Sequence, residues 1–141
     1  MFIDIKRDLD NPVVRKLVSE SAWNKSTEAT DKKVAEFRSK KNWDLYGWIE
    51  DDEILGVCGV EAHSDWVEII NIAVGQNIRK RGIGKAMITA LQQKYKMTIT
   101  AETDDNAVEF YQKCGFETEG FIKTYNSIEC KRYKCVLNYN L

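Results

Sequence analysis

The chain has 141 residues, 43% of them hydrophobic and 30% charged, and its 21 basic side chains nearly balance its 22 acidic ones. This predicts one domain over residues 1–141 with a packed core, and the net charge of -1 argues against a general polyanion binder. Because the sequence has no apolar run of about 18 residues and its first ten residues carry charges, we expect no membrane association and a cytoplasmic location.

The first part of the chain predicts a strand, two helices and three more strands. Pro12, after Asp10 and Asn11, suits the first position of a helix, and an acidic turn at 51–52 separates two strands of a hairpin. The last of these strands is apolar on both faces, which is typical of a central strand. The expected elements are a strand at 2–6, helices from Pro12 and over 27–40, and strands at 45–50, 53–62 and 66–74.

The second part predicts a helix at 83–95, a strand at 97–102, a short helix that ends at Gly115, and strands near 116–122 and 132–139. The order β-α-α-β-β-β-α-β-α-β-β combines antiparallel hairpins with one strand-helix-strand unit. We therefore expect an α/β (α+β) fold with a mixed, mostly antiparallel sheet of about six or seven strands, flanked by about four helices.

Charge is strongly segregated along the chain. No acidic residue occurs between Glu68 and Glu102, whereas this window holds six basic residues: Arg79, Lys80, Arg81, Lys85, Lys94 and Lys96. Gly82 and Gly84 remove side chains where a loop turns into a helix, so backbone N–H groups there can converge on a ligand. The pattern predicts a phosphate or pyrophosphate site at this helix start, while Lys94 and Lys96 are expected to be solvated charges at its other end.

Two other phosphate sites fit less well. The chain has no G-x-x-x-x-G-K-[ST] sequence, so a P-loop is poorly supported. GIGKAM resembles the beginning of a dinucleotide fingerprint, but Met87 stands at the third glycine position, the loop after Val74 is too long, and no second βαβ half follows. Four cysteines, at 58, 114, 130 and 135, and the single histidine lack metal-site or redox-pair spacing, so we expect free thiols and no metal.

Two motifs together resemble the GNAT superfamily of acyl-CoA N-acyltransferases. The sequence RKRGIG at 79–84 is similar to its R/Q-x-x-G-x-G/A signature and follows a suitable strand, EIINIAV. Asn106 and Tyr111, in NAVEFYQKCGF, resemble its second signature. The resemblance covers about residues 66–121, and the hairpin at 45–62 fits the layout. Residues 1–44 and 122–141 match only in the order of elements.

The resemblance implies direct transfer of an acetyl group from acetyl-CoA to a primary amine of a small molecule or protein, without metal. It implies that the backbone of Ile72, Ala73 and Val74 pairs with the pantetheine arm and that Asn106 contacts the pantetheine end. It further implies that the backbone from Arg79 through Lys80, Arg81, Gly82, Ile83 and Gly84 to Lys85 holds the pyrophosphate. Dimers are common among such proteins, so a homodimer is a further expectation.

The two candidate catalytic residues each have a simpler alternative. Tyr111, with an ordinary pKa of about 10 against about 8.5 for a thiol, is expected to give its proton to the leaving thiolate; alternatively its ring only packs. Glu68 is the only carboxylate in the apolar run 66–74 and resembles the family's general base; alternatively it is a solvated strand residue. Asn106 could instead cap its helix, in a capping box with Glu109.

Other polar and aromatic residues have structural explanations. His63 is expected to be a solvated turn residue, Cys114 to be packed and inert, and the four tryptophans to favour the core over an acceptor pocket. Two rival functions stay open: a non-catalytic acyl-CoA-binding module, and a nucleic-acid binder that uses the basic window and would bind in a strongly salt-dependent way.

Overall fold

The computed structural model describes residues 1–22, 24–79 and 81–140. Its elements follow the predicted order, with short 3-10 turns at Lys6–Asp8 and Gln76–Ile78. They are β1 (Phe2–Asp4), α1 (Pro12–Glu20), α2 (Thr27–Ser39), β2 (Trp43–Glu50), β3 (Glu53–Ala62), β4 (Trp66–Val74), α3 (Ile83–Tyr95), β5 (Thr98–Thr103), α4 (Val108–Lys113), β6 (Glu117–Tyr125) and β7 (Ile128–Leu137). Within these ranges, no helix has the length and apolar character needed to cross a membrane.

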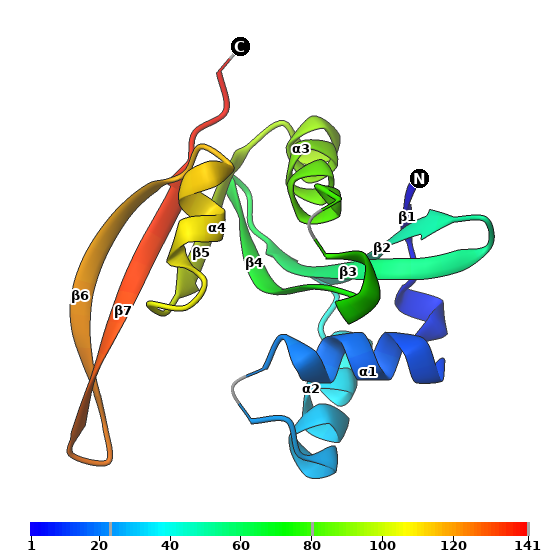
Figure 1. Ribbon diagram of the computed structural model, residues 1–141, viewed down its shortest axis with the longest axis horizontal. Helices are drawn as coiled ribbons and strands as arrows, with labels where there is room; N and C mark the ends of the chain where they lie inside the picture. The colour runs from blue at the N-terminus through cyan, green and yellow to red at the C-terminus, as the bar shows by residue number, and fades with distance from the viewer. Residues whose placement is uncertain (23, 80, 141) are drawn as a thin grey trace.

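The strands form one seven-stranded sheet in the order β1-β2-β3-β4-β5-β7-β6 (Figure 1). All neighbouring strands are antiparallel except β4 and β5, which are parallel and joined by α3. The mixed, mostly antiparallel sheet predicted from the order of elements is therefore confirmed. It leaves two edges, the three-residue β1 and the nine-residue β6.

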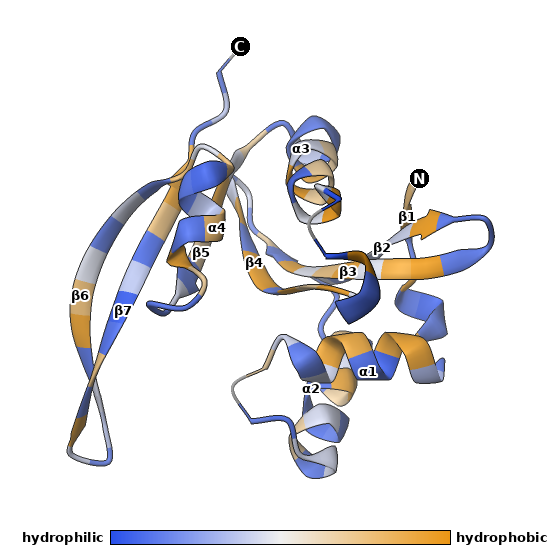
Figure 2. Cartoon of the chain, viewed as in Figure 1, coloured by the Kyte–Doolittle hydropathy of each residue, from blue (hydrophilic) through white to orange (hydrophobic). Residues whose placement is uncertain are grey.

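Two apolar clusters lie on opposite faces of the sheet. One joins α1 and α2 to the sheet through Val14, Leu17, Val34 and Phe37. The other joins α3 and α4 through Met87, Leu91 and Tyr111, among others. Apolar residues of α1 turn toward the sheet (Figure 2). β4 contributes Val67 and Ile69 to the second cluster and Ala73 to the first, because a bulge between Ile69 and Asn71 shifts the alternation of its side chains by one residue.

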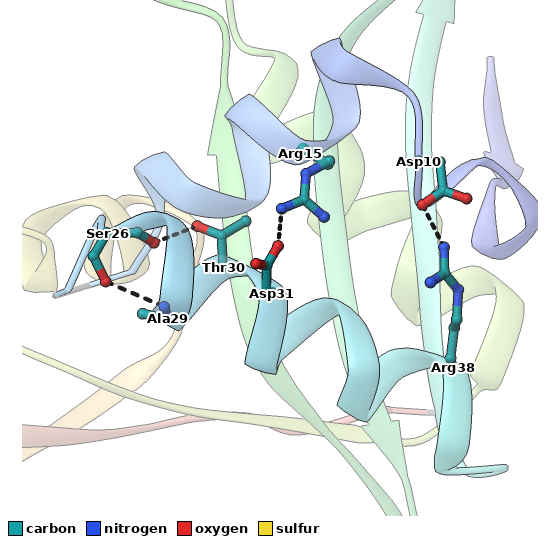
Figure 3. A network of polar contacts seen from close by, with 7 residues as sticks. All are labelled: Asp10, Arg15, Ser26, Ala29, Thr30, Asp31 and Arg38. Carbon is teal, nitrogen blue, oxygen red and sulfur yellow. Dashed lines mark hydrogen bonds and ion pairs between the residues drawn. The ribbon is translucent and has the colours of Figure 1, made fainter.

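Side-chain caps mark the starts of the two N-terminal helices, and ion pairs link the two helices at the surface. Asn11 caps α1 by accepting a 2.8 Å hydrogen bond from the Val13 N–H, with Pro12 at the first helical position as predicted. Ser26 caps α2 through the Ala29 N–H, and the carboxylates of Asp31 and Asp10 bind arginines across the α1–α2 pair (Figure 3). These exposed pairs contribute at most about 1 kcal/mol each, so burial holds the helices in place.

Several boundaries differ from the prediction, most clearly at β1 and in the hairpin of β6 and β7. β1 ends at Asp4 because Ile5 turns into the core, where it is 1% exposed. The hairpin of β6 and β7 is longer than expected, and it reverses at Asn126 and Ser127, which both have positive φ. The predicted turn at Asp51 and Asp52 has the same left-handed backbone. Such a two-residue turn matches the twist of antiparallel strands, so it can support a long hairpin without glycine.

Candidate active site

The central strands β4 and β5 separate halfway along their length. They pair only where Trp66–Glu68 lies beside Thr98–Thr100. Beyond Glu68, β4 continues along β3 while β5 continues along β7, and an extra residue at Ile70 forms a bulge in β4. The β5-facing backbone edge of β4 from Ile69 to Val74 therefore has no neighbouring strand. Ile72, Ala73 and Val74 all lie on this edge.

The free edge of β4 leads into the N-terminus of α3. Gly82 is the residue before the helix and has a φ of +78°, a left-handed conformation that favours glycine. No side chain caps this end, so the N–H groups of the first turn, Ile83, Gly84 and Lys85, have no partner within the helix. Their partial positive charge and free donors suit an anion.

Packing against α4 also requires glycine at position 84. A Cβ at this position would lie 2.8 Å from Cε1 of Phe110 on α4, so glycine lets the two helices approach. Around Gly82, by contrast, a Cβ would meet nothing within 4 Å. A bulky substitution at Gly84 would therefore displace α4 as well as obstruct a ligand, and it does not test the anion site cleanly.

The arginines before α3 already have partners. Arg79 donates from Nε to the Val74 carbonyl at 3.3 Å, and Arg81 pairs with Glu50 of β2 at 3.1 Å. Hydrogen bonds from Trp48 and then from Arg81 hold the pKa of Glu50 below its ordinary value. The basic stretch before α3 has no acidic residue near it in the sequence, but the fold places the Glu50 carboxylate beside it. Lys80 lies outside the described residues.

A hollow of about 430 Å³ lies beside α3, on the side toward α4 and the end of β7. It is lined by residues of α3, by Cys114 after α4, and by the end of β7: Lys85, Ile88, Thr89, Gln92, Gln93, Lys96, Cys114, Leu137 and Tyr139. Lys85, at the first turn of α3, borders it and forms no ion pair with the described residues. Burial raises the pKa of the Cys114 thiol, and all four cysteines are free, as expected.

Tyr111 is a buried residue of α4 with 6% exposure. Its ring meets Phe110 and Phe116 edge-on at 5.2 Å, so the packing role is real. Burial is the main cause that raises its pKa, followed by the nearby thiols of Cys58 and Cys135. The hydroxyl forms no hydrogen bond with the part of the chain that the structure describes. Because burial raises its pKa above the ordinary value, the hydroxyl stays protonated in neutral and alkaline solution.

The buried environment of Tyr111 makes the expected proton transfer to the leaving thiolate unfavourable. An acid gives its proton readily only to a base whose conjugate acid has the higher pKa. A thiol has a pKa of about 8.5, whereas that of Tyr111 starts at about 10 and is raised further, so complete transfer to a thiolate is uphill. The hydroxyl is instead suited to stabilise a thiolate as a hydrogen-bond donor.

Glu68 lies on the opposite face of the sheet, toward α1 and α2. It stands directly across from Glu61 of β3 and beside Thr100 of β5. Burial raises its pKa most, and the negative charges of Glu61 and Glu102 raise it further. Glu102 shares this face because it lies two residues after Thr100. The site thus gathers three carboxylates on three adjacent strands.

The two flanking carboxylates have partners, whereas Glu68 has none among the residues described. Glu61 accepts a 2.6 Å hydrogen bond from Trp43 and lies 2.9 Å from His63 Nε2, and Glu102 pairs with Lys123 and Arg132. An unpaired, partly buried carboxylate with a raised pKa is suited to accept a proton.

His63 and Trp66 differ from their expected roles. His63 is half-buried, binds Glu61 and stacks on Trp66 at 4.2 Å, so the interpretation as a solvated turn residue is wrong. Trp66 is 40% exposed instead of packed in the core, while Trp43 is 4% exposed as expected. Trp48 is half-buried, and Trp23 lies outside the described residues.

The capping role considered for Asn106 is wrong. The residue before α4 is Ala107, which has no side-chain cap. The Asp104 carboxylate accepts the N–H groups of both Asn106 and Ala107, at 3.0 and 3.1 Å. Glu109 pairs with Lys113 along the helix instead of closing a capping box. The side chain of Asn106 is exposed and free for another contact.

Sequence reasoning missed Asn71. This residue follows the bulge of β4 on the same face as Glu68 and is 7% exposed. Both polar atoms of its amide are buried without a hydrogen-bond partner among the described residues. It lies across from Gly59, where any side chain would collide with the Asn71 amide and the Phe37 ring. The available signal was a lone amide within the apolar sequence EIINIAV.

The charge around Glu68 makes a direct prediction. Replacing Glu61 with Gln removes the nearest negative charge, so the pKa of Glu68 should fall toward its ordinary value. Carboxyl-carbon NMR titration of Glu68 measures this. The exposed Glu53, at the far end of β3, offers a control, and Glu53→Gln should leave the Glu68 titration in place. An unchanged pKa in Glu61→Gln would show that the two carboxylates are not electrostatically coupled.

Comparison with known proteins agrees with this architecture. The model of the acetyltransferase (GNAT) family matches residues 13–116. The chain belongs to the GNAT acetyltransferase family. An uncharacterized N-acetyltransferase of Bacillus methanolicus, encoded in the lysA 3' region, is 33% identical over 57% of this chain and 68% of its own length. The uncharacterized N-acetyltransferase YvbK of Bacillus subtilis is 31% identical over 57% and 64%.

Solved structures of the family share the fold. Aminoglycoside 6'-N-acetyltransferase complexed with coenzyme A superimposes with a TM-score of 0.79 at 17% identity, covering 100% of this chain and 98% of that one. A GNAT acetyltransferase from Elizabethkingia anophelis with acetyl-CoA bound gives 0.71 at 20% identity, with 98% and 97% covered. A Bacillus subtilis acetyltransferase in complex with CoA gives 0.59 at 25% identity, with 80% and 84% covered.

Proposed function

We propose that this acetyltransferase moves an acetyl group from acetyl-CoA directly to a primary amine. The observation that carries the proposal is the unpaired edge of β4, Ile69 to Val74, which leads to the uncapped N-terminus of α3. An extended chain with amide groups can add to such an edge, and a pyrophosphate suits the free N–H groups of the helix. Coenzyme A has both parts in this order, and the solved relatives with bound CoA or acetyl-CoA support the same ligand.

In this proposal, Ile72, Ala73 and Val74 pair with the pantetheine arm, and the backbone of residues 79–85 holds the pyrophosphate. Arg79 and Arg81 shape the turn through Val74 and Glu50, so among the described cations of residues 79–85 Lys85 is the one best placed to reach the phosphates. Asn106 contacts the pantetheine end. Acetyl-CoA supplies the activated acetyl group, and the residues of the chain position it and manage the protons.

The amine approaches from the face that carries Glu68. A primary amine arrives mostly as an ammonium ion at neutral pH, and only its neutral form is a nucleophile. Glu68 removes this proton through a water molecule, and the neutral nitrogen attacks the thioester carbonyl carbon. As the C–N bond forms and the C–S bond breaks, Tyr111 donates a hydrogen bond to the departing thiolate on the other side, and the second amine proton passes to water. Each group acts without forming a covalent bond to the substrate, so the transfer takes place in a ternary complex.

The three carboxylates around the amine position favour a cationic acceptor. Glu61, Glu68 and Glu102 lie on one face of β3, β4 and β5, and although Lys123 and Arg132 offset Glu102, the charges of Glu61 and Glu68 leave the surroundings of the amine position negative. A field of this sign raises the local concentration of ammonium ions. We therefore place small polyamines and amino sugars before neutral arylamines as acceptors. The cytoplasmic location expected from the sequence stays a prediction.

The anion site is tested with two lysines of the same helix. Replacing Lys85 with Gln removes a positive charge at the first turn of α3, and we expect CoA affinity to fall about tenfold. Lys94→Gln removes a charge near the C-terminus of α3, so it should leave affinity unchanged. Thermal-shift titration with CoA measures both. Equal affinities of the Lys85 variant and the parent would remove Lys85 from the site.

A non-catalytic acyl-CoA-binding module is the alternative. An acetyltransferase and a binding module should both be stabilised by CoA, but only the enzyme releases free thiol from acetyl-CoA when an amine is added. An acceptor screen that includes polyamines and amino sugars separates them. Binding without thiol release across the whole panel would favour the module.

A further inference from the structure

We propose that Asn71 holds the water molecule through which Glu68 takes the proton of the acceptor amine. Asn71 is then a positioning residue, because it acts on the reaction through this water and makes no contact with acetyl-CoA. The inference rests on the proposed function, in which Glu68 is the general base.

A bulge turns Asn71 to the face of the sheet that carries Glu68. In a regular strand these two residues, three positions apart, would point to opposite faces. The register of β4 with β3 leaves Ile70 as an extra residue between them, so the alternation shifts by one and Asn71 shares the side of α1 and α2 with Glu68. Ala73, two residues further on, packs in the cluster on this side. Bulges beside active sites re-aim side chains in this way.

The amide of Asn71 is enclosed but has no hydrogen-bond partner. The residue is 7% exposed, and both Oδ1 and Nδ2 are buried without a partner among the described residues. Gly59 of β3, directly across, leaves the space that the amide needs, since a Cβ there would collide with the amide and with the ring of Phe37. The packing around Gly59 is thus shaped for an amide that makes no hydrogen bond with the described chain.

Such an amide destabilises the folded protein unless a group from outside the chain completes its hydrogen bonds. Buried polar groups of proteins are nearly always paired, with protein atoms, ordered water or a ligand. Leucine has almost the same shape as asparagine and would fill the space without this cost. The amide of Asn71 therefore indicates a partner that arrives from outside, and the amine site beside it can supply one.

Asn71 lies within reach of Glu68 through one water molecule. The two residues are about two regular strand positions apart on one face, which is roughly 6.6 Å. A water with hydrogen bonds of about 2.8 Å to each side chain spans about 5.6 Å. The free edge of β4 begins at Ile69, and in the proposed complex the pantetheine arm pairs with residues 72–74, so the thioester lies beside the stretch between them. The bridging water therefore lies next to both the base and the reacting carbonyl carbon.

The water passes the proton from the amine to Glu68. No hydrogen bond to the described residues holds the Asn71 amide beside Phe37, so the amide turns toward Glu68 when the amine and its water enter. Oδ1 accepts one hydrogen of this water, the other hydrogen faces the Glu68 carboxylate, and a lone pair of the oxygen faces the ammonium. The ammonium N–H bond breaks as the water gains that proton, and the water's O–H bond toward Glu68 breaks as the carboxylate gains it. The water is regenerated, and the nitrogen is neutral.

Replacing Asn71 with Leu tests this role. Leucine keeps the shape and removes both polar atoms, so the variant should unfold at the same temperature as the wild type or at a higher one. Its kcat/KM, measured as thiol release with the most active amine of the acceptor screen, should be about tenfold lower near neutral pH. The loss should disappear in alkaline solution, where neutral amine needs no base. An unchanged kcat/KM, or a loss of the same size at every pH, would overturn the proposal.

A double-mutant cycle shows whether Asn71 acts through Glu68. In the Glu68→Gln background the water no longer leads to a base, so adding Asn71→Leu should change kcat/KM less than about twofold. Tyr111→Phe is the control background, because Tyr111 acts on the thiolate from the other face, and there Asn71→Leu should keep its loss of about tenfold. Equal losses in both backgrounds would show that Asn71 acts independently of Glu68, against the proposal.

Asn71→Asp distinguishes binding of the water from a packing role. Aspartate keeps an oxygen that accepts a hydrogen of the water, but it brings a charge into a buried position. Near neutral pH, kcat/KM of the Asp variant should exceed that of the Leu variant, whereas its melting temperature should be the lower of the two. Activities that follow the order of the melting temperatures would show that Asn71 acts only through packing.

The activity of Glu68→Gln separates a failure of this inference from a failure of the proposed function. Wild-type activity in Glu68→Gln would exclude the base and, with it, the role of Asn71. A large loss in Glu68→Gln together with wild-type activity in Asn71→Leu would leave the base in place and overturn only the role of Asn71.

Discussion

Replacing Glu68 with Gln should lower kcat/KM about 100- to 1,000-fold near neutral pH, because the variant keeps the shape of the side chain but cannot accept a proton. The loss should shrink in alkaline solution. An amine with a pKa of about 10.4 gains about tenfold in its neutral form for each pH unit up to that value, and neutral amine needs no base. The kcat/KM of Glu68→Gln should therefore rise by about a factor of ten for each pH unit in this range.

The wild type has the opposite dependence at low pH. A general base acts as the carboxylate, so activity falls as the pH drops through the pKa of Glu68. Burial and the charges of Glu61 and Glu102 raise this pKa, which moves the acid limb above the range of an ordinary glutamate. Glu61→Gln should move that limb to lower pH, by the same shift in the pKa of Glu68 that the NMR titration is expected to show.

The variant Glu68→Asp distinguishes a role of Glu68 as general base from a structural role. It keeps the carboxylate but moves it back by one methylene, so part of the neutral-pH activity should survive and the alkaline recovery should be weak. A uniform loss at every pH in both variants would indicate a positional or folding role. A Glu68→Gln profile that superimposes on the wild type would exclude a base at this position.

Hydrophobic periodicity was sufficient to predict most of the fold. The strand at 66–74 and the helix at 83–95 have the predicted bounds, because both bury apolar residues in a regular pattern. The hairpin of β6 and β7 was predicted too short because its outer half is exposed on both faces. Without burial, no apolar and polar alternation marks where its strands begin and end.

Long-range contacts explain what the sequence could not show about the site. Motif spacing indicated the start of α3 and the helix with Tyr111, but Glu50 comes from 31 residues before Arg81 and reduces the positive charge there. The separation of β4 from β5 depends on which strands pair with each other, and this pairing cannot be predicted from the local sequence. At α4, Asp104 and Asn106 are both good capping residues, and only the backbone path selects Asp104.

Replacing Tyr111 with Phe should lower kcat about 10- to 1,000-fold while leaving acetyl-CoA affinity unchanged. The ring keeps its contacts with Phe110 and Phe116, and only the hydroxyl is lost. That hydroxyl forms no hydrogen bond with the described residues, so its removal should not destabilise the fold. Single-turnover rates, CoA titration and thermal unfolding measure the three quantities separately.

Tyr95→Phe is the matched control. The Tyr95 hydroxyl lies 2.7 Å from that of Tyr46 and 3.1 Å from the Asp44 carboxylate, where it ties the end of α3 to β2. Its loss should lower the free energy of unfolding by about 1 kcal/mol and leave kcat unchanged. The two tyrosines are thus expected to show opposite effects, one on catalysis and the other on stability.

The pH profile of the wild type adds an independent check on Tyr111. Because burial raises its pKa above the ordinary value, the hydroxyl remains a donor at any pH at which the enzyme is folded and assayed. No alkaline loss of kcat should therefore arise from Tyr111, and Tyr111→Phe should lower the profile by a constant factor. If the variant instead removes an alkaline limb that the wild type has, Tyr111 ionises in the working range and the buried hydroxyl is not the donor proposed here. An unchanged kcat at every pH would leave the ring as a packing residue of α4.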